Sequence, residues 1–380
     1  MKFRFDQTLT KEDMRQLSLR HIYEHFGYVH YKMNKFEEYD LYAENKDFLA
    51  GDKIITFTDT NGRLLALKPD VTLSIVKNYI DVPGEVKKVY YSENIYRTSR
   101  NTRTYKEIMQ TGLECIGDLD VYQTAEVLML AAASLEALGE SRYILDVSHM
   151  GLIRGFLQEL ELRPKHEEMF LSLLRKKNVH GIRTLFDSIG TGDELRETAI
   201  ALASTYGSPE SVIEVLRESS LNDTMDEALD ELETICRILE AQGADGVHLD
   251  FSLVNDMSYY NGVMFRGYIE GIPSGVLSGG RYDELLDKMG KRRSEKSGAI
   301  GFAINMDLIN GCAEDQEEYD VDVLLLYGKA AESEDFDPED LADRVNTLIE
   351  EGYSVQAQKN PPERLKYRKL VEYLPGGVLK

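Results

Sequence analysis

The stretch Leu253-Val-Asn-Asp-Met-Ser-Tyr-Tyr-Asn-Gly-Val-Met-Phe265 decides how the rest of the chain is interpreted. Apolar residues on either side of a short polar break predict a buried strand, a break and a second strand. In a strand, Tyr259 and Tyr260 would point to opposite faces, so that one ring lines a cavity while the other packs. Downstream, Ser278-Gly-Gly-Arg-Tyr-Asp283 joins a glycine pair, which lets backbone approach closely, to the start of a helical run.

The composition is typical of a globular protein with two or three domains. The chain has 380 residues, of which 42% are hydrophobic and 29% are charged. No apolar run approaches the roughly 18 residues of a membrane span, and Met1-Lys-Phe-Arg-Phe-Asp6 lacks the apolar stretch of a secretory signal. Cys115, Cys236 and Cys312 are too widely spaced for a metal-ligand cluster, so we expect reduced thiols in a cytoplasmic protein.

The charge balance argues against a nucleic-acid-binding protein. Asp and Glu number 67 against 44 Lys and Arg, which gives a net charge of −23. Nucleic-acid binders usually present a basic patch, because phosphate contacts supply most of their affinity. The overall field of this chain repels tRNA and DNA. We therefore expect neither a nucleic-acid partner nor a membrane partner.

The first third of the chain predicts a mixture of helices and antiparallel strands. Thr10 to Gly27 has the pattern of a capped helix, and a strand follows from Tyr28 to Tyr31. Two apolar runs around Asp59-Thr-Asn-Gly62 predict a hairpin. Further elements are expected as a helix from Leu73 to Tyr79, strands from Val86 to Tyr91 and Tyr105 to Gly117, and a helix over 120–139.

A run of helical patterns interrupts the predicted sheet at about 164–243 and indicates a helical insertion. Strands resume at Val247, and acidic Glu314-Asp-Gln-Glu-Glu318 is typical of a linker. The tail predicts a small α/β module with two strands and two helices. The domain interpretation is 1–312, including the insertion, followed by 320–380. In the tail we expect a strand (Val321–Tyr327), a helix (Asp337–Glu351), a strand (Tyr353–Ala357) and a second helix.

Two polar patches in the first third carry groups that suit the ends of an amino acid. In Lys68-Pro-Asp-Val-Thr72, proline fixes the turn while Asp70 and Thr72 offer acceptors to an ammonium group. Arg97 lies at the end of a predicted strand, where its guanidinium is suited to clamp a carboxylate with two hydrogen bonds.

Two further patches complete the expected pocket. In the strand Gln110-Thr-Gly-Leu-Glu114, Gln110 and Glu114 share a face and Gly112 leaves room between them. The fourth patch is the tyrosine stretch with the Gly-Gly-Arg-Tyr-Asp loop, which adds Tyr282.

Together the four patches describe a site for a zwitterion that carries a polar ring. Histidine fits, because an imidazole N–H donates to Glu114 while the ring stacks on tyrosine. Residue chemistry alone also allows other amino acids.

In this order, with a helical insertion, these residues resemble histidyl-tRNA synthetase and its paralogues over about residues 5–312. The resemblance implies an α+β fold: a class II aminoacyl-tRNA synthetase-like antiparallel sheet flanked by helices, followed by a small module resembling part of an anticodon-binding domain. It also implies a set of histidine-binding residues, namely Asp70, Thr72, Arg97, Gln110, Glu114, Tyr259, Tyr260 and Tyr282.

The resemblance is carried by six motifs. The Pro-Glu-Gly-Thr-like turn is matched by Pro69-Asp-Val-Thr72, and the motif Phe-Arg-x-Glu is matched by Tyr96-Arg-Thr-Ser99. The strand motif Gln-x-Gly-x-Glu is matched by Gln110 to Glu114, and the histidine signature Leu-Val-Arg-Gly-Leu-Asp-Tyr-Tyr is matched by Leu253 to Tyr260. The motif Gly-Phe-Ala-x-Gly-x-Glu-Arg is matched by Gly301 to Leu308, and Gly-Gly-Arg-Tyr-Asp is intact at 279–283.

Three departures from the synthetase pattern fall on its nucleotide-activating positions. Asn255 and Leu308 stand where the synthetases have arginines, and Ser99 stands where they have a glutamate that helps to hold ATP. Preorganised cations stabilise the charge that develops during adenylation, and each lost group typically costs on the order of 10²–10³ in rate. We therefore expect these to be degenerate former catalytic positions, in a chain with no catalytic residue.

The combination resembles the regulatory subunits of ATP phosphoribosyltransferase (the HisZ family), which are paralogues of histidyl-tRNA synthetase in histidine biosynthesis. This resemblance implies a homodimer assembled with the short-form catalytic subunit (HisG), feedback inhibition by L-histidine, and no cofactor. Two alternatives stay open: a divergent histidyl-tRNA synthetase, and a stand-alone histidine-sensing protein.

Overall fold

The computed structural model describes residues 9–49, 54–98, 104–139, 142–160, 162–254, 259–294, 296–312, 319–334, 336–374 and 378–379. Contacts within the chain divide it into two compact units. One comprises Met1–Met14 with Ala313–Lys380, and the other is Arg15–Cys312. As domain limits, the boundaries 1–312, 164–243 and 320–380 stay predictions.

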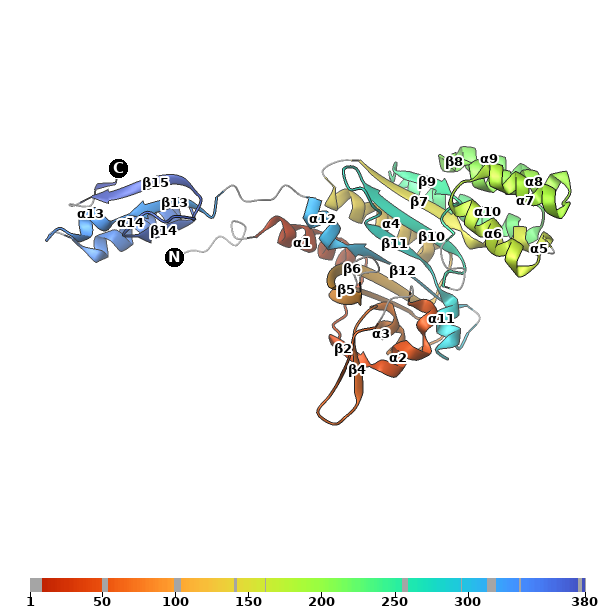
Figure 1. Ribbon diagram of the computed structural model, residues 1–380, viewed down its shortest axis with the longest axis horizontal. Helices are drawn as coiled ribbons and strands as arrows, with labels where there is room; N and C mark the ends of the chain where they lie inside the picture. Colours follow the sequence, from red (N-terminus) through yellow and green to blue (C-terminus); the bar gives the residue numbers. More distant parts are fainter. Residues whose placement is uncertain are drawn as a thin grey trace. The chain divides into compact units, whose positions relative to one another are not determined.

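In the described part of the larger unit, nine strands form one sheet in the order β1-β5-β6-β12-β11-β10-β7-β9-β8 (Figure 1). Neighbouring strands run antiparallel except for two parallel pairs, β1 with β5 and β7 with β9. The predicted antiparallel sheet is confirmed. Its strands are β1 (Val29–His30), β5 (Val86–Thr98), β6 (Tyr105–Asp118), β7 (Tyr143–His149), β8 (Tyr206–Gly207), β9 (Val247–Asp250), β10 (Val263–Ile269), β11 (Leu277–Arg281) and β12 (Ser297–Asn305).

One face of this sheet packs on α1 (Lys11–His25) and α4 (Val121–Leu138). Leu113, Phe265 and Phe302 are buried in the same core as both helices, and the Tyr23 hydroxyl of α1 lies 2.9 Å from the Ser134 hydroxyl of α4. The helix expected to start at Thr10 is confirmed, since the Asp13 N–H donates to the Thr10 hydroxyl oxygen at 3.1 Å.

The opposite face carries a second core and the predicted site. It packs against α3 (Thr72–Lys77) and α11 (Asp283–Lys288), whose residues Ile75 and Leu285 are buried together with Tyr91 of β5. The predicted hairpin is confirmed beside it. It belongs to a small sheet of β2 (Phe36–Glu38), β3 (Thr56–Thr58) and β4 (Leu64–Leu67), next to the short helices α2 (Tyr39–Glu44) and η2 (Lys46–Phe48).

The predicted run of helices is present and continues the first core. Phe156, Phe170 and Phe186 lie with their ring centroids 5.2–6.2 Å apart and join this run to the helix that follows β7. The short strand β8, which the sequence did not predict, returns the chain to the edge of the large sheet. The helices are α5 (Met150–Glu159), α6 (Pro164–Arg175), α7 (Val179–Ile189), α8 (Asp193–Ser204), α9 (Pro209–Glu218) and α10 (Asp223–Ala241), and α12 (Met306–Cys312) follows β12.

The smaller unit contains a four-stranded sheet in the order β14-β13-β15-β16. The predicted second helix of the tail is wrong, because β15 (Tyr367–Leu374) is a strand parallel to β13 (Val321–Leu326). Alternating burial of Val371 and Tyr373 explains the difference, since it places both on one face. The other elements are α13 (Gly328–Ala331), α14 (Pro338–Glu350), β14 (Val355–Gln358) and β16 (Val378–Leu379). No described helix is both long and apolar enough to cross a membrane.

The expected strand at Leu253 is also wrong. The Ser252 N–H donates to the Asp250 carboxylate at 2.9 Å, and the Val254 N–H donates to the Ser252 carbonyl at 2.7 Å. These local bonds turn the chain directly after β9, so that Leu253 and Val254 lie in no strand, while 255–258 are outside the described residues. The second predicted strand is confirmed as β10.

The N-terminal capping box of α4, a helix that packs against the large sheet, can be tested by mutation. Asp120 accepts from the Tyr122 N–H at 2.7 Å, while the Gln123 side chain accepts from the Asp120 N–H at 3.0 Å. We predict that Asp120→Ala lowers the free energy of unfolding by about 1 kcal/mol, because this capping box is lost. Ser208→Ala, at a helix N-terminus where the serine caps no backbone N–H, is the control. Equal losses in denaturant titrations of the two variants would contradict the prediction.

Candidate functional site

The centre of the site is the buried carboxylate of Glu114 on β6, which is only 2% exposed. The Thr72 hydroxyl, at the start of α3, donates to one of its oxygens at 2.6 Å. The Tyr282 hydroxyl, just before α11, donates to the other at 2.6 Å. Across the sheet, a Cβ at Gly301 would overlap the carboxylate, so that only glycine leaves room for it there. Three predicted site residues, far apart in the sequence, therefore meet around one buried group.

Burial controls the protonation of Glu114. Desolvation disfavours the charged form and raises the pKa of the carboxyl to about 8, although the hydrogen bonds from Thr72 and Tyr282 favour the ionised form. The nearby negative charge of Asp70 raises the pKa further. At neutral pH the unliganded site therefore holds a proton that an ordinary glutamate would have released.

Asp70 and Arg97 meet at the loop before α3. The Asp70 carboxylate accepts from the Leu73 N–H at 2.9 Å, and Arg97 Nε donates to the Pro69 carbonyl at 3.0 Å. Burial raises the pKa of Asp70, while the Leu73 hydrogen bond and the positive charge of Arg97 oppose the rise. The loop before α3 thus carries the expected anion, Asp70, and its Pro69 carbonyl accepts a hydrogen bond from the expected cation, Arg97.

The two tyrosines of the signature stretch precede β10 and lie in no strand, so the expectation of opposite strand faces is wrong. Their ring centroids are 4.6 Å apart at 79°, and the Tyr259 ring also lies 5.9 Å from that of Tyr282. The division of roles that was expected still occurs. Tyr260 lines a cavity, whereas Tyr259 packs against Tyr282 and Phe48.

A cavity of about 270 Å³ opens beside the buried carboxylate. Among the predicted residues it is lined by Arg97, Gln110 and Tyr260. Asp70, Thr72, Glu114, Tyr259 and Tyr282 lie outside this lining. The structure therefore brings the predicted residues together as two layers, a cavity wall and a hydrogen-bonded layer centred on Glu114.

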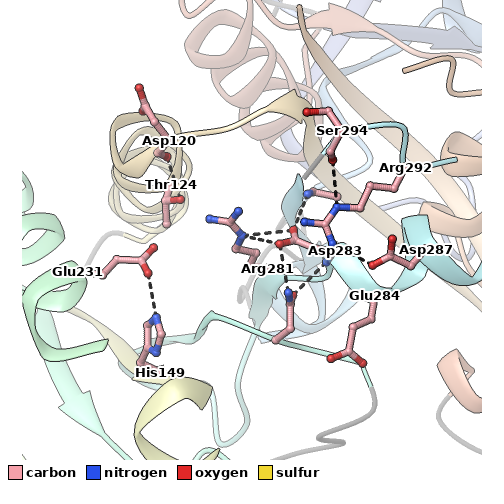
Figure 2. A network of polar contacts seen from close by, with 12 residues as sticks. Asp120, Thr124, His149, Glu231, Arg281, Asp283, Glu284, Asp287, Arg292 and Ser294 are labelled. Carbon is pink, nitrogen blue, oxygen red and sulfur yellow. Dashed lines mark hydrogen bonds and ion pairs between the residues drawn. The ribbon is translucent and has the colours of Figure 1, made fainter. Parts of the chain in front are cut away.

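The Gly-Gly-Arg-Tyr-Asp segment runs from the end of β11 into α11, and its contacts position Tyr282. A Cβ at Gly280 would come within 2.6 Å of the Tyr260 ring. The Arg281 guanidinium pairs with the Asp283 carboxylate at 2.9 Å, and Asp283 also accepts from the Ala299 N–H at 2.8 Å (Figure 2). These contacts fix the backbone on either side of Tyr282 and so aim its hydroxyl at Glu114.

The three departures from the synthetase pattern are only partly visible. Leu308 on α12 is half-buried and packs against the first core, and its side chain supplies no positive charge. Ser99 and Asn255 lie outside the described residues, as does the expected acidic linker at Glu314 to Glu318. In the described part of the chain, Cys115 and Cys236 are free and buried, and no group of His, Cys, Asp or Glu is arranged to hold a metal.

Sequence reasoning missed several residues of the cavity wall. Arg266 of β10, Ser278 of β11 and Asn305 of β12 line it with the predicted residues. One signal pointed to Arg266, because it is the only charged residue in the strand Val263 to Ile269. Ser278 and Asn305 lie next to or within motifs that carry the resemblance, but their side chains carried no signal for a ligand site.

Comparison with known proteins identifies what the chain resembles. The family model of histidyl-tRNA synthetase matches residues 5–309. The ATP phosphoribosyltransferase regulatory subunit of Oceanobacillus iheyensis is 28% identical over 285 residues, which cover 74% of this chain and 69% of that protein.

Solved structures share the fold. The ATP phosphoribosyltransferase regulatory subunit/histidyl-tRNA synthetase of Bacillus halodurans superposes with a TM-score of 0.77 at 23% identity, covering 97% of this chain and 94% of that one. A chain of the ATP phosphoribosyl transferase (HisG:HisZ) complex of Thermotoga maritima gives a TM-score of 0.60 at 20% identity, covering 80% and 98%. The expected class II synthetase-like fold is therefore confirmed.

The raised pKa of Glu114 predicts how stability depends on pH. Between the ordinary value of 4.5 and about 8, the folded chain keeps a proton that the unfolded chain has released, so that rising pH favours unfolding. Glu114→Gln carries no titrating proton at this position. From pH 5 to 8 we expect the wild-type chain to lose unfolding free energy relative to this variant, by up to about 1.4 kcal/mol per pH unit. A difference between the two chains that stays constant across this range would contradict the assignment.

Proposed function

The chain belongs to the histidyl-tRNA synthetase family, and from this membership we propose that it is a non-catalytic regulatory subunit of ATP phosphoribosyltransferase. In this role it binds L-histidine in the former amino-acid pocket and mediates feedback inhibition of histidine biosynthesis. Relatives that carry the name of this subunit, at 28% and 26% identity, support the proposal.

The observation that carries the proposal is a pocket with groups for both ends of an amino acid, in a chain that has Leu308 where the synthetases have an arginine. Arg97 faces the cavity, and the acceptors of Asp70 and Glu114 lie next to it. At about 270 Å³ the cavity lies just below the roughly 300–1,000 Å³ that is usual for ligand sites, which favours a free amino acid over an amino acid together with a nucleotide.

The charges that are missing support the proposed lack of catalysis. Leu308 offers no positive charge to a triphosphate, and the sequence places Asn255 where the synthetases have an arginine. Without preorganised cations, the charge that develops on an α-phosphate during adenylation is not stabilised. A chain of this kind retains an amino acid without activating it.

Feedback requires that histidine bind one state of an assembly better than another. We propose that the chain forms a homodimer within a hetero-oligomer containing the short-form catalytic subunit, HisG. The Thermotoga maritima complex, whose chain shares this fold, supports such a partner. The binding free energy of histidine would then favour a less active arrangement of the catalytic subunits.

A second candidate function is that of a divergent histidyl-tRNA synthetase, which the description of the family model favours. The distinguishing test is histidine-dependent exchange of pyrophosphate into ATP. Exchange by the purified chain would support the synthetase, and its absence would support the regulatory subunit.

The experiment that tests the proposal is reconstitution of the phosphoribosyltransferase. We predict that a short-form catalytic subunit gains activity when this chain is added, and that a histidine titration then reverses the gain, because the effector favours the inactive assembly. The reaction of ATP with phosphoribosyl pyrophosphate is followed directly. Activity that is independent of this chain, or that histidine leaves unchanged, would contradict the proposal.

Histidine binding by the isolated chain provides a narrower test. An imidazole N–H would donate to Glu114, whose oxygens each have a lone pair left after the bonds from Thr72 and Tyr282. We predict that Glu114→Ala weakens binding about 10- to 100-fold in calorimetry, since the buried imidazole N–H is left without its hydrogen-bond acceptor. Glu107→Ala, in the same strand but with an exposed side chain, is the control and should bind as the wild type does. An affinity that Glu114→Ala leaves unchanged would move the effector site elsewhere.

A further inference from the structure

We propose that Arg266 of β10 binds the carboxylate of the amino-acid effector, as a second cation of the pocket beside Arg97. The inference rests on the proposed function, because it names the group that recognises one end of the same ligand. Neither the sequence motifs nor the family resemblance selects this residue.

The registers of the sheet place Arg266 on the face that carries the site. Arg266 is paired with Ser278 of β11, which is paired with Ala303 of β12. Ala303 is in turn paired with Gly112 of β6, between Gln110 and Glu114. Because directly paired residues point to the same face of a sheet, the arginine shares the face of these two site residues.

The guanidinium of Arg266 is available to a ligand. The side chain is half-buried and lines the cavity, and among the described residues it makes no hydrogen bond or ion pair. Its guanidinium carbon lies 5.7 Å from the centroid of the Tyr268 ring, a contact that orients the group without using its N–H donors. A partly desolvated guanidinium with free donors favours an anionic partner.

Gly275, in the loop before β11, makes room for this arrangement. A Cβ at Gly275 would overlap Arg266 Nε and come within 3.1 Å of Arg266 Cγ. The glycine is therefore the residue over which the arginine side chain lies. Its backbone is outside the left-handed region, so an alanine there changes little except the space left for the guanidinium.

The charged residues that line the cavity favour an anionic group of the ligand. Of the described residues that line it, Arg97 and Arg266 are charged and none is acidic. The acceptors for an ammonium group or a ring N–H, Asp70 and Glu114, lie outside this lining. The pocket therefore has a polarity, with its oxyanion end in the cavity and its cation end at the buried carboxylates. A zwitterion with its carboxylate toward Arg266 matches that polarity.

A purely structural role for Arg266 would be to neutralise Asp146, its register partner on β7. Asp146 is 7% exposed, and one of its oxygens has no hydrogen-bond partner among the described residues. The two side chains form no ion pair in the unliganded chain. The structural role predicts that loss of Arg266 changes stability and leaves ligand affinity unchanged, which separates it from the proposal.

The test is calorimetry on the full chain with two ligands, histidine and histamine, which lacks the carboxylate. Arg266→Gln should weaken histidine binding about 10- to 100-fold, as expected for loss of a charge-assisted hydrogen bond, and leave histamine binding unchanged. Arg266→Lys keeps the positive charge but lacks the planar guanidinium, so its histidine affinity should fall between those of the wild type and Arg266→Gln. Arg183→Gln, which removes an exposed arginine from α7, is the matched control and should bind as the wild type does.

Gly275→Ala is a second test of the same contact that keeps every charge of the chain. It tests the proposal even if Arg266→Gln does not fold. It should weaken histidine binding, and in the double variant it should add nothing to the loss caused by Arg266→Gln, because both changes act on one contact. Equal histidine affinity in the wild type, Arg266→Gln and Gly275→Ala would overturn this inference alone. A wild-type chain that binds no histidine would overturn the proposed function and this inference with it. Inorganic phosphate that binds the wild type but not Arg266→Gln, with histidine affinity equal in both, would assign the arginine to a phosphate and overturn the carboxylate.

Discussion

Two hydroxyl hydrogen bonds to one desolvated carboxylate hold the site together. Thr72 and Tyr282 belong to different elements, and each reaches Glu114 of β6 at 2.6 Å. A buried carboxylate without such partners would cost several kcal/mol, so the bonds and the elements that supply them are needed together. Glycine at position 301 is part of the same arrangement, since any side chain there would overlap the carboxylate.

That buried group gives the pocket its direction. Acceptors lie at the Glu114 end, and guanidinium donors line the cavity, so that under the proposed function the two groups bind opposite ends of a free amino acid. The same fold could activate the amino acid only with further cations placed for a nucleotide. At one such position the chain has Leu308, which packs on the core. Binding and activation are thus separable properties of one scaffold.

Sequence reasoning was accurate where a side chain or a turn carries its own signal. The hairpin around Asp59 to Gly62, the capped helix starting at Thr10 and the shared face of Gln110 and Glu114 all follow from local rules, and the structure contains them. It failed at Leu253 and in the tail strand β15. At the first, a short turn closed by Asp250 replaces the apolar strand pattern. At the second, pairing with β13 overrides local helical preference.

The layering of the site was also beyond the sequence. Residue types indicated which side chains belong together, but only the registers of β10, β11 and β12 place Arg266 in the cavity wall and leave Glu114 behind it. Register is a property of the whole sheet and of the glycines that allow close approach. Two glycines, Gly275 and Gly279, accordingly line the cavity.

The most direct measurement is the chemical form of labelled histidine retained by the purified chain in the presence of magnesium ATP. The chain is separated from free label, denatured, and the released compound is identified. The account predicts that intact histidine is recovered in the same amount with and without ATP, because the pocket holds the amino acid and nothing activates it. Recovery of histidyl adenylate, or of no label under saturating histidine, would contradict it.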